Sequence, residues 1–216
     1  MRRYLHPLLL ACGVGVLLAP AAVKAAPAAA PDTKAAPPAA AAAAATSAEV
    51  PAGKQKTDQT ISLEVTVDAS PAEVYRLWTT SEGVKKFIAP AAEIDPVVGG
   101  RYQVAFDPAH DPDGKAYGTY ACKILRLEPN HLVSFEWTFP PLGAELNTQP
   151  FPTWVEVRID PVPGEPGQSI VHLQHFGFPH SEKWDKAFVV FRDRNWPHVL
   201  ATLKGYCHQQ AQKPAQ

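Results

Sequence analysis

The sequence has no excess of charge of either sign. Its 216 residues carry 20 Lys and Arg side chains against 21 Asp and Glu, which gives a formal net charge of −1 at pH 7. A protein that binds nucleic acid needs a clustered positive face to neutralise phosphates. The balance therefore argues against nucleic acid as a partner, and the length indicates one domain with an appendage.

Long hydrophobic runs are also missing. The apolar stretch 8–18 is about eleven residues long, whereas a membrane-spanning helix needs roughly 20. Arg2 and Arg3 precede this run, and small-residue cleavage sites follow it at Ala21 and Ala25. This order is typical of a signal peptide over residues 1–25. It predicts a periplasmic or secreted protein with no transmembrane span after cleavage.

Two other interpretations of this start remain open. The segment 9–12 resembles a bacterial lipobox, in which Cys12 would carry a lipid and anchor the protein. The Arg2-Arg3 pair also resembles, weakly, the start of a twin-arginine export signal.

Cysteine is scarce, with three in the whole chain. Removal of the signal peptide would leave Cys122 and Cys207. In an oxidising compartment these two could form a disulfide, or they could be two small buried residues. The sequence does not give the distance between them, so both alternatives stay open.

Motifs for catalysis and metal binding are absent as well. No nucleophile motif accompanies the histidines, and a strand would place His172 and His175 on opposite faces. Asp107, Asp111 and Asp113 resemble a calcium-binding loop but lack its spacing and its distal Glu. The sequence therefore predicts a solvated loop there, with no metal and no cofactor.

Proline, by contrast, is abundant, with 23 residues. Residues 26–56 consist largely of Ala and Pro, including the poly-alanine run 39–45. This composition cannot form a core, which predicts a flexible or semi-extended tether. The folded domain is expected over residues 57–210, followed by a short tail, 211–216.

The domain begins with a strand and two short helices. Apolar and polar residues alternate over 61–67, which predicts a half-buried strand. Ser70 and Glu73 form a capping box around Pro71, so a helix should follow, with Trp78 on its inner face. A second short helix is expected over 81–88, with Phe87 facing inward.

Several strands follow, separated by turns. The pattern predicts strands over 92–98, 101–106, 117–128, 132–139, 153–160 and 169–176. Short turns between them favour antiparallel neighbours. The longest irregular piece is the Pro-rich loop 140–152. Trp154 lies on the outward parity of its strand and is expected to be exposed.

The last element is a long amphipathic helix over 181–209. Ser181 is a good N-cap, and apolar residues recur in steps of three and four from Trp184 to Tyr206. Pro197 lies inside this helix and predicts a kink rather than an end, because the apolar spacing resumes at Val199.

Strands in a run before one long helix indicate an α+β domain. A sheet of about six to seven strands would curl around the helix, and the curl would leave space between the two. A concave apolar site is expected in that space.

Several motifs, in order, resemble a known family. They are 68–78 (DASPAEVYRLW), 98–102 (VGGRY), 118–120 (GTY), 127–133 (LEPNHLV), 135–137 (FEW), 153–157 (TWVEV), 175–178 (HFGF), 196–200 (WPHVL) and 203–206 (LKGY). Together they resemble the heat-shock-ATPase-activator-homologue branch of the START-like (SRPBCC) superfamily. The resemblance covers about residues 60–207.

The resemblance implies a helix-grip fold, in which a curved antiparallel sheet wraps around a long C-terminal helix. The family often has a Trp pair where this chain has Phe87-Ile88, at the expected mouth of the cavity. The activator role requires a cytosolic chaperone ATPase, which an exported protein would not meet. The family name is therefore not by itself a function.

Aromatic side chains dominate the expected cavity, which suits binding of a small, mostly apolar molecule by shape. The candidate ligand-binding residues are Trp78, Phe87, Tyr102, Phe106, Tyr120, Phe135, Trp137, His175, Trp184 and Phe188. His175 shares strand parity with Val171 and Leu173 and should point inward.

Two alternatives to a binding module remain. The first is an enzyme of the cyclase or hydrolase kind found among relatives, with His175 and Tyr102 or Tyr120 as acid or base. The second is a stress-related scaffold that binds an unknown protein partner through its surface, for which an exposed Trp154 is the sequence hint.

Overall fold

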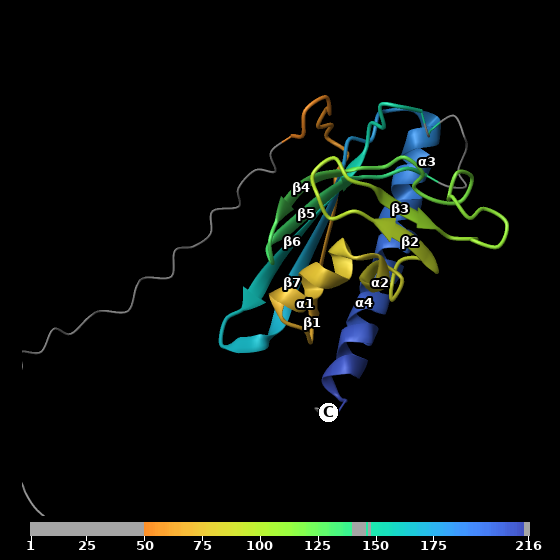
Figure 1. The fold of residues 1–216 in the computed structure, drawn as a ribbon. Helices are drawn as coiled ribbons and strands as arrows, with labels where there is room; N and C mark the ends of the chain where they lie inside the picture. Colours follow the sequence, from red (N-terminus) through yellow and green to blue (C-terminus); the bar gives the residue numbers. More distant parts are fainter. Residues whose placement is uncertain (1–49, 140–145, 147, 214–216) are drawn as a thin grey trace, which may run out of the picture. The chain divides into compact units, whose positions relative to one another are not determined.

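The computed structural model of the chain describes residues 50–139, 146 and 148–213. The predicted signal peptide, Cys12, the tether up to residue 49 and the end of the tail lie outside the described residues. The described part is an α+β domain in which a five-stranded antiparallel sheet carries a long C-terminal helix (Figure 1), which confirms the predicted fold class. Among the helices of this part, none is both long and apolar enough to cross a membrane.

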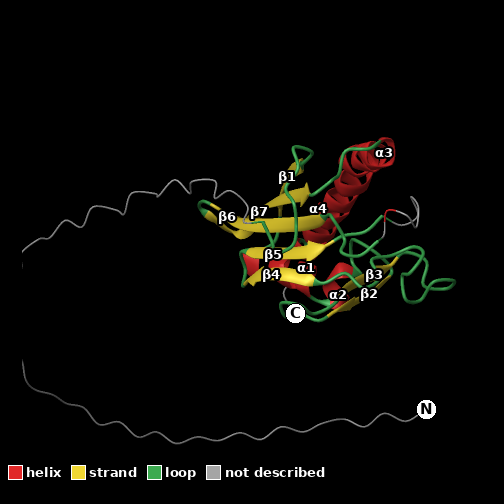
Figure 2. Cartoon of the chain, turned by 90° about the horizontal axis from the view of Figure 1, so that it is seen from above, coloured by secondary structure: helices red, strands yellow, loops and turns green. Residues whose placement is uncertain are grey.

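The main sheet has the strand order β1-β7-β6-β5-β4, with every neighbouring pair antiparallel. Its strands are β1 (Ile61–Val67), β4 (Ile124–Glu128), β5 (Leu132–Glu136), β6 (Trp154–Val162) and β7 (Glu165–Phe176). A separate hairpin pairs β2 (Ala91–Ile94) with β3 (Tyr102–Ala105). One bridge, between Arg101 and Lys123, connects this hairpin to the start of β4. Figure 2 shows the helices together on one side of the main sheet.

Alternation along the strands correctly predicted the inner face of the sheet. In β1, Ile61 and Val67 are buried while Ser62, Glu64 and Thr66 are exposed. In β7, Val171, Leu173 and His175 are buried on the same face. This face forms the core because apolar side chains two residues apart point to the same side of a pleated strand.

The predicted strand 117–128 is wrong over its first half. Only Ile124–Glu128 is regular, and Ala121 has a positive φ of 64°, which an extended strand cannot contain. Thr119 explains the local path: its hydroxyl donates to the carbonyl of Tyr102, and it accepts from the N–H of Val104. The segment is therefore held to β3 by the Thr119 side chain together with single backbone bonds, such as that from the N–H of Thr119 to the carbonyl of Val104, and it forms no regular strand.

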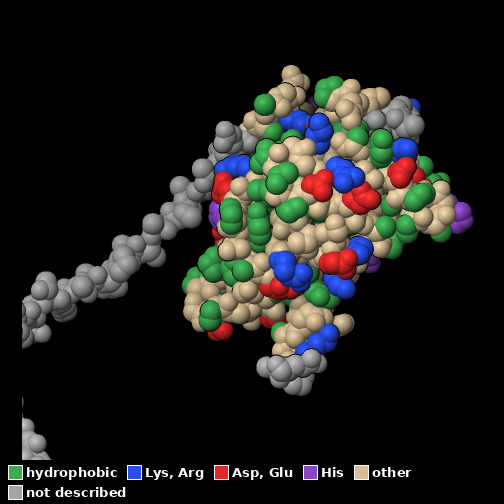
Figure 3. Space-filling model, viewed as in Figure 1, with side chains coloured by type: hydrophobic (Ala, Val, Ile, Leu, Met, Phe, Trp, Pro, Cys, Tyr) green, Lys and Arg blue, Asp and Glu red, His purple; other side chains and the backbone are tan. Residues whose placement is uncertain are grey.

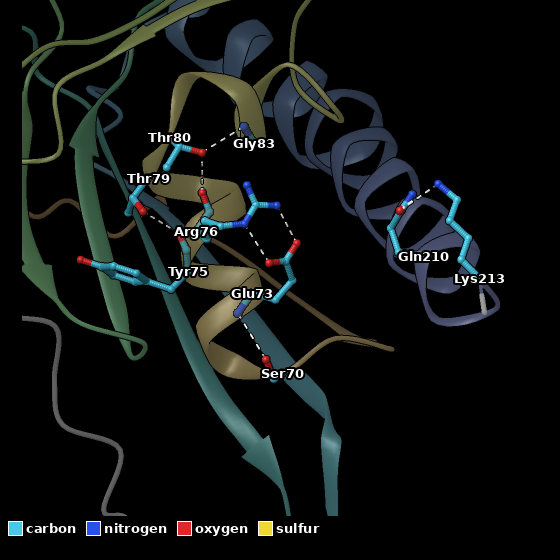
Figure 4. A network of polar contacts seen from close by, with 9 residues as sticks. All are labelled: Ser70, Glu73, Tyr75, Arg76, Thr79, Thr80, Gly83, Gln210 and Lys213. Carbon is cyan, nitrogen blue, oxygen red and sulfur yellow. Dashed lines mark hydrogen bonds and ion pairs between the residues drawn. The ribbon is translucent and has the colours of Figure 1, made fainter. Parts of the chain in front are cut away.

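The first two helices follow their capping signals. Helix α1 (Pro71–Thr79) begins after Ser70, whose hydroxyl accepts from the N–H of Glu73. Helix α2 (Ser81–Val84) is capped in the same way by Thr80. The carboxylate of Glu73 binds the guanidinium of Arg76 through two bonds of 2.7 and 2.8 Å (Figure 4), on the exposed side of α1.

The C-terminal helix contains a π-helical turn that the sequence did not predict. It runs as α3 (Glu182–Val190), the π turn Phe191–Asn195 and α4 (Trp196–Ala211). Ser181 caps α3 as expected. At the end of the π turn the N–H of Trp196 donates to the carbonyl of Phe191, five residues back. Pro197 lies in the first turn of α4, where a residue without an N–H is tolerated. The helix thus accommodates Pro197 by widening just before it.

The prediction that Trp154 is exposed is wrong, because its side chain is buried. Glu136, Trp154 and Phe176 form one row across β5, β6 and β7 on the outer face of the sheet. The segment before β1 covers this row: Lys54 Nζ lies 2.6 Å from Glu136 Oε1, and Lys56 Nζ lies 5.2 Å from the centre of the Phe176 ring. Ordered contacts thus begin N-terminal to Thr57.

Both cysteines of the domain are free thiols and are buried. Burial raises the pKa of Cys122, and it raises the pKa of Cys207 to about 11. Of the two alternatives from the sequence, the structure has two small buried residues and no bridge between them.

Candidate functional site

A pocket of about 480 Å³ lies beside the π turn. Its wall is formed by Ile88, Phe106, Trp137, Phe191, Arg194, Asn195, Trp196, His198 and Val199. Six of these nine residues come from the π turn and the first turn of α4. The others follow α2, β3 and β5. The volume falls within the roughly 300–1,000 Å³ of typical small-molecule sites.

The π turn gives this pocket its composition. Phe191, the first residue of the turn, and Trp196, which follows the turn, are buried. Arg194 and Asn195, within the turn, are exposed. One more residue per turn rotates the side chains relative to an α-helix, which is why π turns recur at functional sites. The result is an apolar interior from the buried aromatics, with a polar rim from Arg194, Asn195 and His198.

Two indoles connect the pocket to the core. Trp137 and Trp196 have ring centres 4.9 Å apart, and both line the pocket while being almost fully buried. Trp196 Nε1 donates a 2.9 Å hydrogen bond to His175 Nδ1. Trp137 Nε1 has no hydrogen-bond partner among the described residues. The pocket wall therefore contains one donor that the domain satisfies and one that it does not.

His175 is buried as predicted, but it is not part of the pocket wall. The rings of Phe139, Phe178 and Phe191 surround it at centre distances of 4.4 to 5.8 Å. Since Trp196 donates to Nδ1, the neutral ring carries its proton on Nε2. Burial lowers the pKa of His175 well below its usual range, so the ring is neutral at pH 7. In this geometry His175 holds Trp196 in place and does not face the pocket.

The ten candidate residues fall into five groups. Trp78, Phe87, Tyr102 and Phe135 pack against one another, with Tyr102 and Phe135 stacked at 3.7 Å and Trp78 edge-on to Phe87 at 4.8 Å. Burial raises the pKa of Tyr102 well above its usual value. These four side chains form one aromatic cluster in the hydrophobic core.

Trp184 and Phe188 lie half-buried on α3, against Phe139 and Phe178 respectively. Phe106 and Trp137 line the pocket. His175 is enclosed in the core, as described above. Tyr120 is 45% exposed and borders a smaller hollow of about 260 Å³, with Lys115 Nζ 5.0 Å above its ring.

Most of this wall is therefore missing from the ten candidate residues. Ile88 was expected at the mouth of the cavity, and Phe191, Trp196 and Val199 were expected only on the apolar face of the helix. Arg194, Asn195 and His198 were not among the candidates. One signal was available: a proline inside a helix requires a local irregularity. Such irregularities are common at functional sites.

The loop 107–114 has a structural explanation. The carboxylate of Asp111 accepts three backbone N–H groups, from Lys115, Ala116 and Tyr117, at 2.7 to 2.9 Å. These bonds lower the pKa of Asp111 although its partial burial acts to raise it. The carboxylate of Asp111 therefore closes this loop onto the backbone that follows it.

Charges on the outer surface are mixed. Figure 3 shows acidic and basic side chains next to one another on the face that it presents, with hydrophobic side chains between them. Several are paired, as in Arg101 with Glu93 and Asp95. This face has no extended patch of one sign.

Comparison with known proteins agrees with the fold. Residues 68–208 match the family described as activator of Hsp90 ATPase homolog 1-like protein. No curated protein sequence matches the chain. A crystal structure of a Mesorhizobium loti protein aligns with a TM-score of 0.54 at 18% identity, covering 69% of this chain and 97% of that one.

Two solution structures are similar in the same way. The Aha1 dimer from Colwellia psychrerythraea has a TM-score of 0.50 at 20% identity, covering 68% of this chain and 95% of that one. A Thermobifida fusca protein has a TM-score of 0.52 at 12% identity, covering 73% of this chain and 98% of that one. At these identities the likeness shows the fold alone. The family match, which covers 141 of the 216 residues, confirms the resemblance found in the sequence motifs.

Proposed function

Because the chain belongs to the family described as activator of Hsp90 ATPase homolog 1-like protein, we propose that it is an exported binding module for a small, mostly apolar molecule. The pocket beside the π turn is its binding site. The fold of the family is compatible with a ligand-binding or a scaffold domain, and the choice between them rests on the pocket.

The observation that carries this proposal is the composition of the wall. Six apolar side chains, four of them aromatic, surround a space of about 480 Å³. Apolar and aromatic walls with a few polar groups are typical of small-molecule sites. The scaffold alternative depended on an exposed Trp154, and Trp154 is buried.

The enzyme alternative has less support from the geometry. Its proposed acid or base, His175, is enclosed by aromatic rings and bonded to Trp196. A general acid or base must come within hydrogen-bond reach of the reacting atom, directly or through one water. Tyr102 is equally buried, in a stack with Phe135.

Uptake of a neutral apolar dye, Nile red, tests the binding function. We expect saturable fluorescence enhancement with the wild-type protein. Val199→Trp should abolish it, because a larger side chain at this half-buried wall position fills the pocket. The matched control is Val189→Trp, on the exposed side of α3 and away from the wall. No uptake by the wild type, or equal uptake by both variants, would contradict the proposal.

Export is tested separately. We expect protein recovered from the periplasm or medium of an expressing bacterium to begin after Ala21 or Ala25 by intact mass. A lipid-modified Cys12 would instead favour the anchored alternative. A full-length chain retained in the cytoplasm would overturn export.

A further inference from the structure

The polar residues of the pocket all lie on one stretch of helix. Arg194, Asn195 and His198 are the only polar side chains among the nine that form the wall. Arg194 and His198 are four residues apart, which places them on neighbouring turns of the same helix face. Among the described residues no acidic side chain belongs to this wall, and Arg194 gives it a permanent positive charge.

The charge of Arg194 acts on the neighbouring carboxylate, Asp193, but less strongly than that of Arg192 does. The adjacent carboxylate, Asp193, is held by Arg192, with Nε 2.6 Å from Oδ1 and the second nitrogen 3.0 Å from Oδ2. The Arg192 guanidinium also lies 5.5 Å from the centre of the Phe188 ring, on the α3 side. Among the described residues Arg194 makes no ion pair, although it lines the pocket. Its guanidinium is therefore available to an anion.

Trp137 contributes its ring to the wall. Its indole Nε1 is buried and has no acceptor among the described residues, so this nitrogen does not face the open space. Among the described residues, Arg194 is therefore the wall side chain that offers charged donors to a ligand.

From these observations we propose that the ligand is an amphipathic carboxylic acid. Its apolar body lies against Trp137, Trp196 and Phe106, and its carboxylate pairs with Arg194 at the rim. The planar guanidinium offers two parallel N–H donors to a carboxylate, a pairing that a lysine does not reproduce. This inference rests on the proposed binding function and adds the chemical class of the ligand.

The test is displacement of bound Nile red by 2-naphthylacetic acid and its methyl ester, which share their apolar body and differ in charge and in one methyl group. At pH 7.5 and low salt we expect the acid to bind the wild type about tenfold more tightly than the ester, since charge-assisted hydrogen bonds are stronger than neutral ones. Raising the salt concentration should reduce this preference, because the rim is exposed.

Two variants assign the preference to one residue. Arg194→Gln should bind acid and ester equally, with each displacement measured against that variant's own affinity for Nile red. The matched control, Lys204→Gln, removes one exposed positive charge from the same helix outside the pocket wall, and it should keep the tenfold preference.

The outcomes separate the two proposals. Equal binding of acid and ester by the wild type, with normal dye uptake, overturns the carboxylate inference and leaves the binding function standing. A preference that survives Arg194→Gln also overturns it. Absence of dye uptake by the wild type overturns the binding function itself.

Discussion

Trp196 Nε1 donates to His175 Nδ1 across 2.9 Å, and both side chains are almost completely buried. The bond joins the middle of the C-terminal helix to the last strand of the sheet, at the point where the π turn ends. The indole N–H and the imidazole Nδ1 satisfy each other, while Nε2 of His175 has no partner among the described residues, and Trp196 is thereby fixed in the pocket wall.

The burial of His175 predicts a specific pH dependence of stability. Burial lowers the pKa of folded His175 below the unfolded value of about 6.5. Below that pH the unfolded chain binds a proton that the folded protein does not, so stability is complete above about pH 6.5 and declines as the pH falls. The slope from this residue is at most about 1.4 kcal/mol per pH unit.

The measurement is urea unfolding between pH 5 and 8. His175→Gln removes the titrating group, so its free energy of unfolding should fall less steeply below pH 6.5 than that of the wild type. Trp196→Phe serves as the control: it lowers stability but retains the histidine and therefore the slope. Parallel curves for the wild type and His175→Gln would show that His175 does not make this contribution.

Gly177 is a position where a methyl group should be damaging. It has a φ of +82°, and an added Cβ would lie 2.3 Å from the carbonyl oxygen of Pro152 and 2.8 Å from the ring of Trp154. Gly177→Ala should therefore lose more stability than backbone strain alone would cause. Gly164 also has a φ of +82° but has nothing within 4 Å.

The difference between Gly177→Ala and Gly164→Ala isolates the clash. We expect Gly164→Ala to cost about 1 kcal/mol and Gly177→Ala about 2–4 kcal/mol, in thermal or urea unfolding. Similar losses in the two variants would mean that Trp154 and the segment at Pro152 can move aside.

The segment before β1 should contribute to stability through Lys54. Its side chain is 4% exposed, and Nζ donates to Glu136 Oε1 at 2.6 Å and to the carbonyl of Phe151 at 2.5 Å. Lys54→Met would leave the Glu136 carboxylate without its cation, which should lower the free energy of unfolding by roughly 2–4 kcal/mol. Lys86→Met, at an exposed site, is the control and should cost under about 0.5 kcal/mol. Equal stabilities of the two variants would mean that the segment is not part of the folded unit.

The two thiols of the domain should be inert in the folded state. Both are buried, and burial raises the pKa of Cys122 and, to about 11, that of Cys207. The thiolate is the reactive form, so alkylation by iodoacetamide at pH 8 should modify neither cysteine within the time that modifies both in urea. Peptide mapping would locate the label, and rapid labelling of native Cys122 would contradict its burial.

Much of the fold could be predicted from the sequence because the signals were local. Alternation over Ile61–Val67 and the caps at Ser70 and Ser181 were confirmed, since each depends on neighbouring residues in the chain. The strand predicted over 117–128 was wrong because its first half is held by Thr119 across β3, a contact between residues far apart in the sequence. Trp154 was judged exposed because the sequence does not show that Lys54 and Lys56 cover the outer face.

The candidate site was predicted less well. Inward parity placed Tyr102, Phe135 and His175 in the interior correctly, but it could not distinguish a ring that lines a space from a ring that packs against another ring. That distinction depends on how side chains from several elements fit together. Only Phe106 and Trp137 of the ten candidates belong to the pocket wall beside the π turn.

The sequence by itself determined the α+β class, the helix caps, the buried face of the sheet and the family, because periodicity, capping and motif order are properties of the linear chain. Only the tertiary structure decided that Trp78, Phe87, Tyr102 and Phe135 pack against one another in the core, and that a pocket opens beside residues 191–199. Side-chain packing and the widening of the helix before Pro197 depend on contacts between distant residues, and such contacts exist only once the chain has folded.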